Sequence, residues 1–212
     1  MTPAYQSDRV TIYCADVCEA VTEVRPVAPA IVLTDPPWMW FPDIEKILAT
    51  KQFDIEHDVM WSGGLLYWAL QWFPDVMHCA EGGAALIFSS PHYAAPFLRI
   101  GDVCDVPWRG AWPAGEMSQI LLAFGTVETG PIPEALRSNN YGQDKDLRTL
   151  SGLLALSPSG LPVFDPFCGG GNTLIAALAS GRQAMGVEIQ EATCERAIRR
   201  VRHYEQTGEV VA

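Results

Sequence analysis

The sequence predicts an α/β fold with a doubly wound sheet, and two observations carry this prediction. Apolar segments such as residues 30–35 run almost without a polar residue, which is typical of strands that are covered on both faces of a parallel sheet. These segments alternate along the chain with segments of helical periodicity. Strands that alternate with helices indicate an open sheet with helices packed on both of its faces.

Each element can be assigned in order from its pattern. β-branched and apolar runs predict strands at residues 10–16, 30–35, 84–90, 105–112 with an irregularity, and 117–125. Apolar residues three and four positions apart predict helices at residues 17–24, 65–81 with a kink at Pro74, 92–100 and 146–156. The polar or Pro- and Gly-rich segments between them, residues 41–64 and 126–145, are expected to be loops.

The C-terminal quarter has the clearest pattern. Residues 161–189 read as a strand, a glycine turn, a helix and a second strand. Asn172 or Thr173 is expected to cap the start of the helix, and Gly181 to end it. A last helix follows, with apolar residues on one side and arginines mostly on the other. That arginine face indicates either a solvated surface or a surface that follows phosphates; the arginines are Arg196, Arg199, Arg200 and Arg202.

Charge and cysteine content limit the classes of function. The chain of 212 residues has a formal net charge of −11, which argues against tight unaided binding to nucleic acid, although a local basic groove remains compatible with it. Six scattered cysteines without a CxxC pair indicate free, buried thiols rather than disulfides or a metal site. The sequence shows neither a secretory signal nor an apolar run long enough for a membrane helix, so we expect a cytoplasmic protein.

The glycine turn has the composition of a ligand-binding loop. Gly169, Gly170 and Gly171 lie between the end of a strand and the start of a helix, where glycines let the backbone approach a ligand closely. Nucleotide-like cofactors bind at this edge of such sheets, and Glu188, which ends the next strand, is placed to accept hydrogen bonds from ribose hydroxyls. A tight turn without a ligand is the alternative. A Walker phosphate loop is excluded because no Gly-Lys-Ser/Thr follows.

A second unusual segment, LTDPPWMW at residues 33–40, follows an apolar strand. Asp35 would lose solvation if it were buried, and Pro36 and Pro37 have no N–H group to offer to a sheet. The segment therefore predicts that polar atoms and a flat aromatic ring are held at the end of a strand, where they could contact a substrate. Trp40 is expected to pack against the protein.

These two segments resemble the motifs of one enzyme family. DPFCGGGNT (residues 165–173) is similar to the cofactor motif D-P-F-x-G-x-G-x-T of DNA amino-methyltransferases that use S-adenosylmethionine, and TDPPW resembles their catalytic motif (D/N/S)-P-P-(Y/F/W). The catalytic motif comes first in this chain, which is the circularly permuted order of the beta class. The resemblance implies a class I methyltransferase fold: a Rossmann-like, mostly parallel sheet of seven strands with one antiparallel edge strand.

The resemblance also implies the organisation of the chain. Residues 1–212 are expected to form a single methyltransferase domain. Its catalytic half is residues 9–125 and its cofactor-binding half is residues 146–207. Residues 126–145, and also residues 39–62, are the segments left for a small target-recognition element.

The resemblance implies methyl transfer to an exocyclic amine of a DNA base. The Asp35 carboxylate and the Pro36 carbonyl would each accept one amine hydrogen, and Pro37 would help to fix the direction of that carbonyl. Trp38 would stack on the base after it has flipped out of the duplex. Asp at the first motif position favours adenine N6. Cytosine N4, an RNA substrate, and an inactive cofactor-binding subunit that scaffolds a partner are the alternatives.

By the same resemblance, a set of residues would hold S-adenosylmethionine. The set is Asp16, Lys145, Asp165, Phe167, Cys168, Gly169, Gly171, Asn172, Thr173 and Glu188. For Asp16 a helix N-cap is the alternative. Lys145 occupies the lysine position of the family's His-x-x-x-Lys-Pro motif, in which Tyr141 replaces the histidine and Asp146 replaces the proline.

The expected partner is DNA, in single-stranded or locally opened form, because an acidic chain neutralises few phosphates. A homodimer or a partner subunit could supply target recognition. Five basic residues are expected to face the DNA beside the catalytic segment: Arg99, Arg109, Arg137, Lys145 and Arg148.

Overall fold

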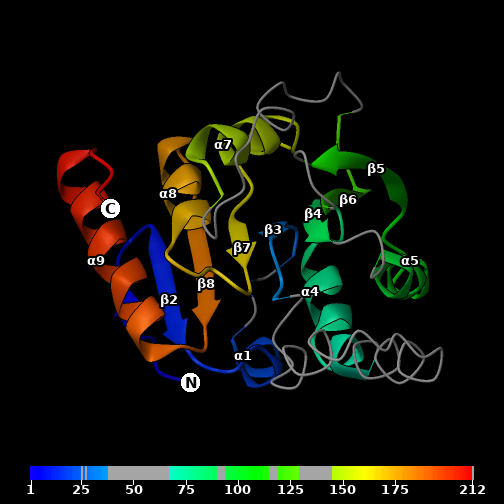
Figure 1. Ribbon diagram of the computed structural model, residues 1–212, viewed down its shortest axis with the longest axis horizontal. Coiled ribbons are helices and arrows are strands. Elements are labelled where there is room, and N and C mark those ends of the chain that lie inside the picture. Colours follow the sequence, from blue (N-terminus) through cyan, green and yellow to red (C-terminus); the bar gives the residue numbers. More distant parts are fainter. Residues whose placement is uncertain are drawn as a thin grey trace, which may run out of the picture.

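The computed structural model describes residues 1–24, 26, 28–37, 67–89, 94–114, 119–128 and 145–211. In these residues an eight-stranded sheet lies between two layers of helices (Figure 1). The strands are β1 (Tyr5–Gln6), β2 (Val10–Cys14), β3 (Ile31–Thr34), β4 (Ala84–Ser89), β5 (Trp108–Ala114), β6 (Gln119–Gly125), β7 (Val163–Asp165) and β8 (Ala184–Glu188). Their order across the sheet is β1-β2-β8-β7-β3-β4-β6-β5.

The helices form two groups that cover opposite faces of the sheet. The helices are α1 (Val17–Glu23), α4 (Phe73–Cys79), α5 (Ala94–Val103), α7 (Leu147–Ala155), α8 (Asn172–Ala179) and α9 (Glu191–Thr207). Buried residues of α7, α8 and α9 pack in one core with Ile31 and Leu33 of β3. Buried residues of α1, α4 and α5 pack in the other core with Val32. Alternate residues of β3 thus enter different cores, which explains its uninterrupted apolar sequence.

The predicted doubly wound, mostly parallel α/β sheet is confirmed, with two differences. The two-residue strand β1, which pairs antiparallel with β2, is an eighth strand. Among the larger strands, the reversed strand β6 lies between β4 and β5 rather than at the edge. β1 is too short to produce a sequence pattern, and strand order depends on contacts between distant segments, which periodicity does not encode.

Most element boundaries agree with the predicted segments within a few residues, and β5 has the expected irregularity between Trp108 and Gly110. The segment predicted as one kinked helix is different. A helical turn at residues 67–70 is followed by α4, and Pro74 lies in the first turn of α4. Proline is favoured there because the N–H groups of the first turn have no partner within the helix. Among the described residues, no helix combines the length and apolar character needed to cross a membrane.

The sheet topology places the two sequence motifs side by side. β3 pairs in parallel with β7, with Val32 opposite Phe164, so the ends of both strands lie at the same edge of the sheet. β8 pairs with β7 on its other side, and β2 pairs with β8. The carboxyl edge of four neighbouring parallel strands therefore carries the residues that the sequence singled out.

Candidate active site

Four acidic residues lie at or just beyond the carboxyl ends of adjacent strands. Asp16 follows β2, Glu188 ends β8, Asp165 ends β7 and Asp35 follows β3. Cofactors and substrates of open α/β sheets bind at this edge. The four acids differ in their partners, and these partners indicate what each one can do.

Asp35 forms an ion pair with Lys145. The Lys145 Nζ atom lies 2.5 Å from Asp35 Oδ2, and Lys145 is only 8% exposed whereas Asp35 is 27% exposed. Pro36 is buried and Pro37 is exposed. Trp38 and Trp40 lie outside the described residues. The sequence predicted that Lys145 contacts the cofactor. It did not predict the ion pair with Asp35, because the two residues are 110 positions apart.

Asp165 is a buried acid that joins β7 to β3 and to the glycine turn. Its Oδ1 accepts a hydrogen bond from Thr34 Oγ1 at 2.7 Å and another from the Phe167 backbone N–H at 3.0 Å. Burial raises the pKa of Asp165 from 3.8 to about 6, because the hydrogen bonds from Thr34, Thr173 and the Phe167 N–H offset only part of the lost solvation. Asp165 therefore holds in place both Thr34, which precedes Asp35, and the start of the glycine turn.

The raised pKa of Asp165 predicts a pH dependence of stability. The folded state holds this proton more tightly than the unfolded chain, so the contribution of Asp165 favours folding below pH 3.8 and is lost as the pH rises through about 6. Relative to the wild type, Asp165→Asn should therefore gain about 2 kcal/mol in free energy of unfolding between pH 4 and pH 7. Urea unfolding of both proteins across this range measures the difference. Parallel profiles would show that Asp165 has an ordinary pKa.

The glycine turn ends in a left-handed residue rather than in a side-chain cap. Gly171, at φ +85°, is the N-cap of α8, and no side chain caps this end. The expectation that Asn172 or Thr173 would be the cap is therefore wrong. A left-handed N-cap suits glycine, and it leaves both side chains available for other contacts: Thr173 hydrogen-bonds with Asp165, and Asn172 donates to the Lys145 carbonyl at 2.8 Å.

Glu188 holds the glycine turn against the end of β8. Its Oε2 accepts a hydrogen bond from the Gly169 N–H at 3.1 Å, and its Oε1 accepts one from the Gln190 N–H at 2.8 Å. The side chain is half-buried. A carboxylate can accept about four hydrogen bonds, so two backbone donors are compatible with further donors from a ligand. The contact to Gly169 joins the two elements that the sequence proposed for one cofactor.

Asp16 is the N-cap of α1, because its Oδ1 accepts a hydrogen bond from the Cys18 N–H at 2.7 Å. This is the alternative that the sequence left open, and a contact with a cofactor stays a prediction.

Phe167 anchors the glycine turn in the apolar core: its ring centroid lies 4.8 Å from that of Trp72 and 5.7 Å from that of Trp68. Cys168 is also buried, and burial raises the pKa of its thiol well above 9.0.

Arg200 belongs to the site, although the helical pattern predicted it on the arginine face of the last helix. Instead of lying on an exposed arginine face, it is 7% exposed, and its guanidinium donates to the Gly170 carbonyl at 2.5 Å and to Asn172 Oδ1 at 2.7 Å. The available signal was its position beside Val201 and three residues after Ala197, at the border of the buried stripe of α9. Arg199, the preceding residue on the helix, is 67% exposed.

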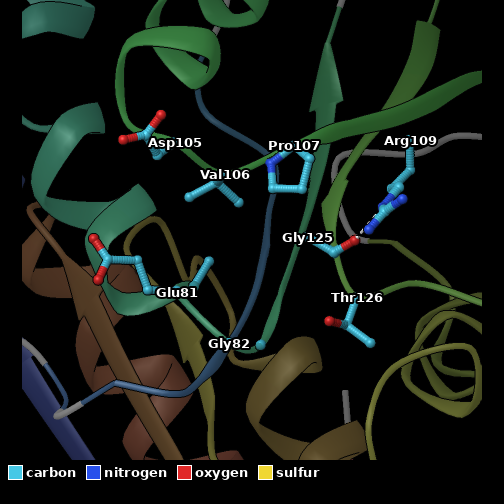
Figure 2. A pocket seen from close by; sticks show the side chains of 10 residues that line it. Glu81, Gly82, Asp105, Val106, Pro107, Arg109, Gly125 and Thr126 are labelled. Atoms are coloured by element: carbon cyan, nitrogen blue, oxygen red, sulfur yellow. Dashed lines mark hydrogen bonds between the residues drawn. The ribbon is translucent and has the colours of Figure 1, made fainter.

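The residues expected to face DNA do not gather at one place. Arg109 lies near the start of β5, at the opposite edge of the sheet, where its Nε donates to the Gly125 carbonyl at 2.7 Å. There it lines an open pocket of about 400 Å³ together with Glu81 and Asp105 (Figure 2). The expectation that Arg109 faces the catalytic segment is therefore wrong. Lys145 is buried, Arg99 and Arg148 lie on α5 and α7, and Arg137 lies outside the described residues.

Known proteins share the fold of this chain. Residues 151–199 match the family model described as DNA methylase. The structure is similar to the M1.HpyAVI–SAM complex, with a TM-score of 0.63 and 18% identity over 90% of this chain and 99% of that chain. It is similar to TTHA0409, a putative DNA modification methylase from Thermus thermophilus complexed with S-adenosyl-L-methionine, with a TM-score of 0.64 and 17% identity over 94% and 95%.

A further similar structure is the cytosine-N4-specific PvuII DNA methyltransferase, with a TM-score of 0.68 and 12% identity over 92% of this chain and 87% of that chain. None of the curated proteins matches the chain. The resemblance found in the sequence is thus confirmed: the chain has the fold of the S-adenosylmethionine-dependent DNA methyltransferases, and its residues 151–199 match the DNA methylase family.

Proposed function

We propose that the protein transfers a methyl group from S-adenosylmethionine to an exocyclic amine of a DNA base, with adenine N6 as the acceptor. The observation that carries this proposal is the position of Asp35. Its carboxylate and the following Pro36 lie at the end of β3, beside the glycine turn and Asp165 at the end of β7. An acceptor for amine hydrogens thus lies next to a loop suited to a nucleoside cofactor.

The described residues fit the cofactor. Gly169 has a φ of +50°, and a Cβ atom added there would meet no described atom within 4 Å, so open space borders the turn. Glu188 is fixed by two backbone N–H groups and retains capacity for ribose hydroxyls. S-adenosylmethionine, when bound, supplies an electrophilic methyl group on a positively charged sulfur.

The residues around Asp35 position and polarise the acceptor. An exocyclic amine is a poor nucleophile because its lone pair is delocalised into the ring of the base. The Asp35 carboxylate accepts a hydrogen bond from one amine hydrogen, and the Pro36 carbonyl accepts a hydrogen bond from the other. These two bonds let the nitrogen become pyramidal towards the methyl group. Trp38 stacks on the base and keeps it in this orientation. The catalytic contribution of the protein is positioning and electrostatic stabilisation, and no strong general base is required.

Nucleoside analysis of methylated DNA tests the proposal. Purified protein, S-adenosylmethionine and mixed-sequence DNA, in duplex and single-stranded form, should yield N6-methyldeoxyadenosine by mass spectrometry. The single strand should react faster because a base that is already unpaired costs less to extrude. N4-methyldeoxycytidine would move the acceptor to cytosine. Cofactor binding without any methylated nucleoside would instead indicate a subunit that scaffolds a partner, and methylation of RNA alone would replace DNA as the substrate.

A further inference from the structure

A continuous path of hydrogen bonds runs from α9 to Asp35. The Arg200 guanidinium donates to the Gly170 carbonyl at 2.5 Å and to Asn172 Oδ1 at 2.7 Å. The Asn172 amide then donates to the Lys145 carbonyl at 2.8 Å. The Lys145 ammonium in turn donates to Asp35 Oδ2 at 2.5 Å. The path crosses from the last helix, through the glycine turn, to the end of β3.

The two cations on this path are buried. Arg200 is 7% exposed and Lys145 is 8% exposed. A third donor of Arg200, its Nε, binds the Val211 carbonyl at 2.8 Å, so contacts to Gly170, Asn172 and Val211 hold the guanidinium in one place. Hydrogen bonds from charged donors are stronger than neutral ones, and low exposure limits screening by water. Hydrogen bonds therefore restrict the side chains at both ends of the path, Arg200 and Lys145.

We propose that Asn172 and Arg200 are positioning residues that act through Lys145 on the Asp35 carboxylate. The proposal rests on the function proposed above, in which Asp35 binds the acceptor amine. The bond from Lys145 limits rotation of the carboxylate, and a carboxylate that accepts this bond retains capacity for an amine hydrogen. Asn172 holds the backbone of Lys145 and so determines where its ammonium can reach.

This assignment changes the role that the sequence suggested for Asn172. Both ends of its amide bind the protein itself, the oxygen to Arg200 and the nitrogen to Lys145. A side chain held in this way is suited to fixing its neighbours rather than to binding a cofactor. The glycine turn, which is expected to hold the cofactor, is thereby joined mechanically to the residue that is expected to hold the base.

Asn172→Asp tests the path with a change that keeps the size of the side chain and adds a negative charge beside Arg200. An aspartate keeps an oxygen acceptor for Arg200 but loses the N–H donor to the Lys145 carbonyl. We expect kcat to fall about 10-fold, because small displacements of reacting groups have effects of this size or larger. Calorimetry should show a dissociation constant for S-adenosylmethionine within about twofold of the wild type. In a Lys145→Met background, Asn172→Asp should have no further effect on kcat, because residues of one network are not additive.

Arg200→Gln and Arg199→Gln form a matched pair on one helix. Arg199 is exposed and lies 3.7 Å from Glu195 in an ion pair, so its replacement should leave kcat and cofactor binding unchanged. Arg200→Gln should lower kcat. Because Arg200→Gln also disrupts three contacts of the guanidinium, Asn172→Asp provides the test if Arg200→Gln does not fold. Equal losses in kcat and cofactor affinity in Asn172→Asp, or additive losses with Lys145→Met, would overturn the proposal and return Asn172 to the cofactor site.

Nuclear magnetic resonance of Lys145 separates this proposal from the proposed function. Its ¹³Cε signal is identified by its loss in Lys145→Met. The signal should shift in Asp35→Asn and in Asn172→Asp and stay in place in Arg199→Gln. A wild-type protein that methylates no DNA would refute the proposed function, and the signal would still report on the path. An unchanged signal in Asn172→Asp would refute the path whether or not the enzyme is active.

Discussion

Replacement of Asp35 by Ala is expected to abolish methyl transfer while binding of S-adenosylmethionine survives. The expected loss in kcat is at least roughly 10²–10³-fold, the usual cost of removing one group aimed at charge that develops in a transition state. Cofactor affinity should change little, because in the proposed function Asp35 binds the acceptor amine and not the cofactor. Steady-state methylation measures the loss in kcat, and calorimetry measures the cofactor affinity.

Because Asp35 pairs with Lys145, the Asp35→Ala experiment needs a second variant that separates the loss of activity from a loss of stability. Asp35→Ala removes this carboxylate from the ammonium of Lys145, which is 8% exposed, and removal of one partner of a buried ion pair destabilises a protein. Asp35→Asn keeps the size and an oxygen acceptor at the same place, so it separates catalysis from stability. Asp102→Ala, which replaces an exposed acid of α5, is the control. Loss of cofactor binding in a folded Asp35→Asn protein would contradict the role given to Asp35.

Replacement of Glu188 by Ala should weaken S-adenosylmethionine binding by about 2–3 kcal/mol, the scale of hydrogen bonds to a charged group. This corresponds to a dissociation constant raised roughly 30- to 150-fold. The reason is twofold, since Glu188 is expected to bind the ribose hydroxyls and already binds the Gly169 N–H of the glycine turn. Calorimetric titration with the cofactor measures the change.

Glu188→Gln helps to separate these two contributions. Glutamine keeps one oxygen that can accept from Gly169, but it loses the charge and one acceptor oxygen. Its affinity should lie between those of the wild type and Glu188→Ala. Glu191→Ala, which replaces an exposed acid in the first turn of α9, is the matched control. If Glu188→Ala left the dissociation constant unchanged, Glu188 would only stabilise the glycine turn and would not bind the cofactor.

Local patterns predicted the elements well. The strands at residues 10–16 and 30–35 appear as β2 and β3, and the strand–turn–helix at the C-terminus appears as β7 and α8. Such patterns reflect constraints that act over a few residues, namely alternation, helical periodicity and the conformational freedom of glycine. Prediction from the sequence was wrong where a side chain had two plausible local uses. Asn172 could cap a helix or bind elsewhere, and only its neighbours in space decide between them.

Adjacent residues are enough to specify the alternation of strands and helices, the glycine turn, and the acids at the strand ends. Other features depend on contacts in the folded protein: the order of the strands, the pairing of Lys145 with Asp35, the burial of Arg200 and the position of Arg109 at the far edge of the sheet. These features join segments that are far apart in the chain. Their energies come from burial and from charge pairs formed only when the sheet is assembled, so no local pattern records them.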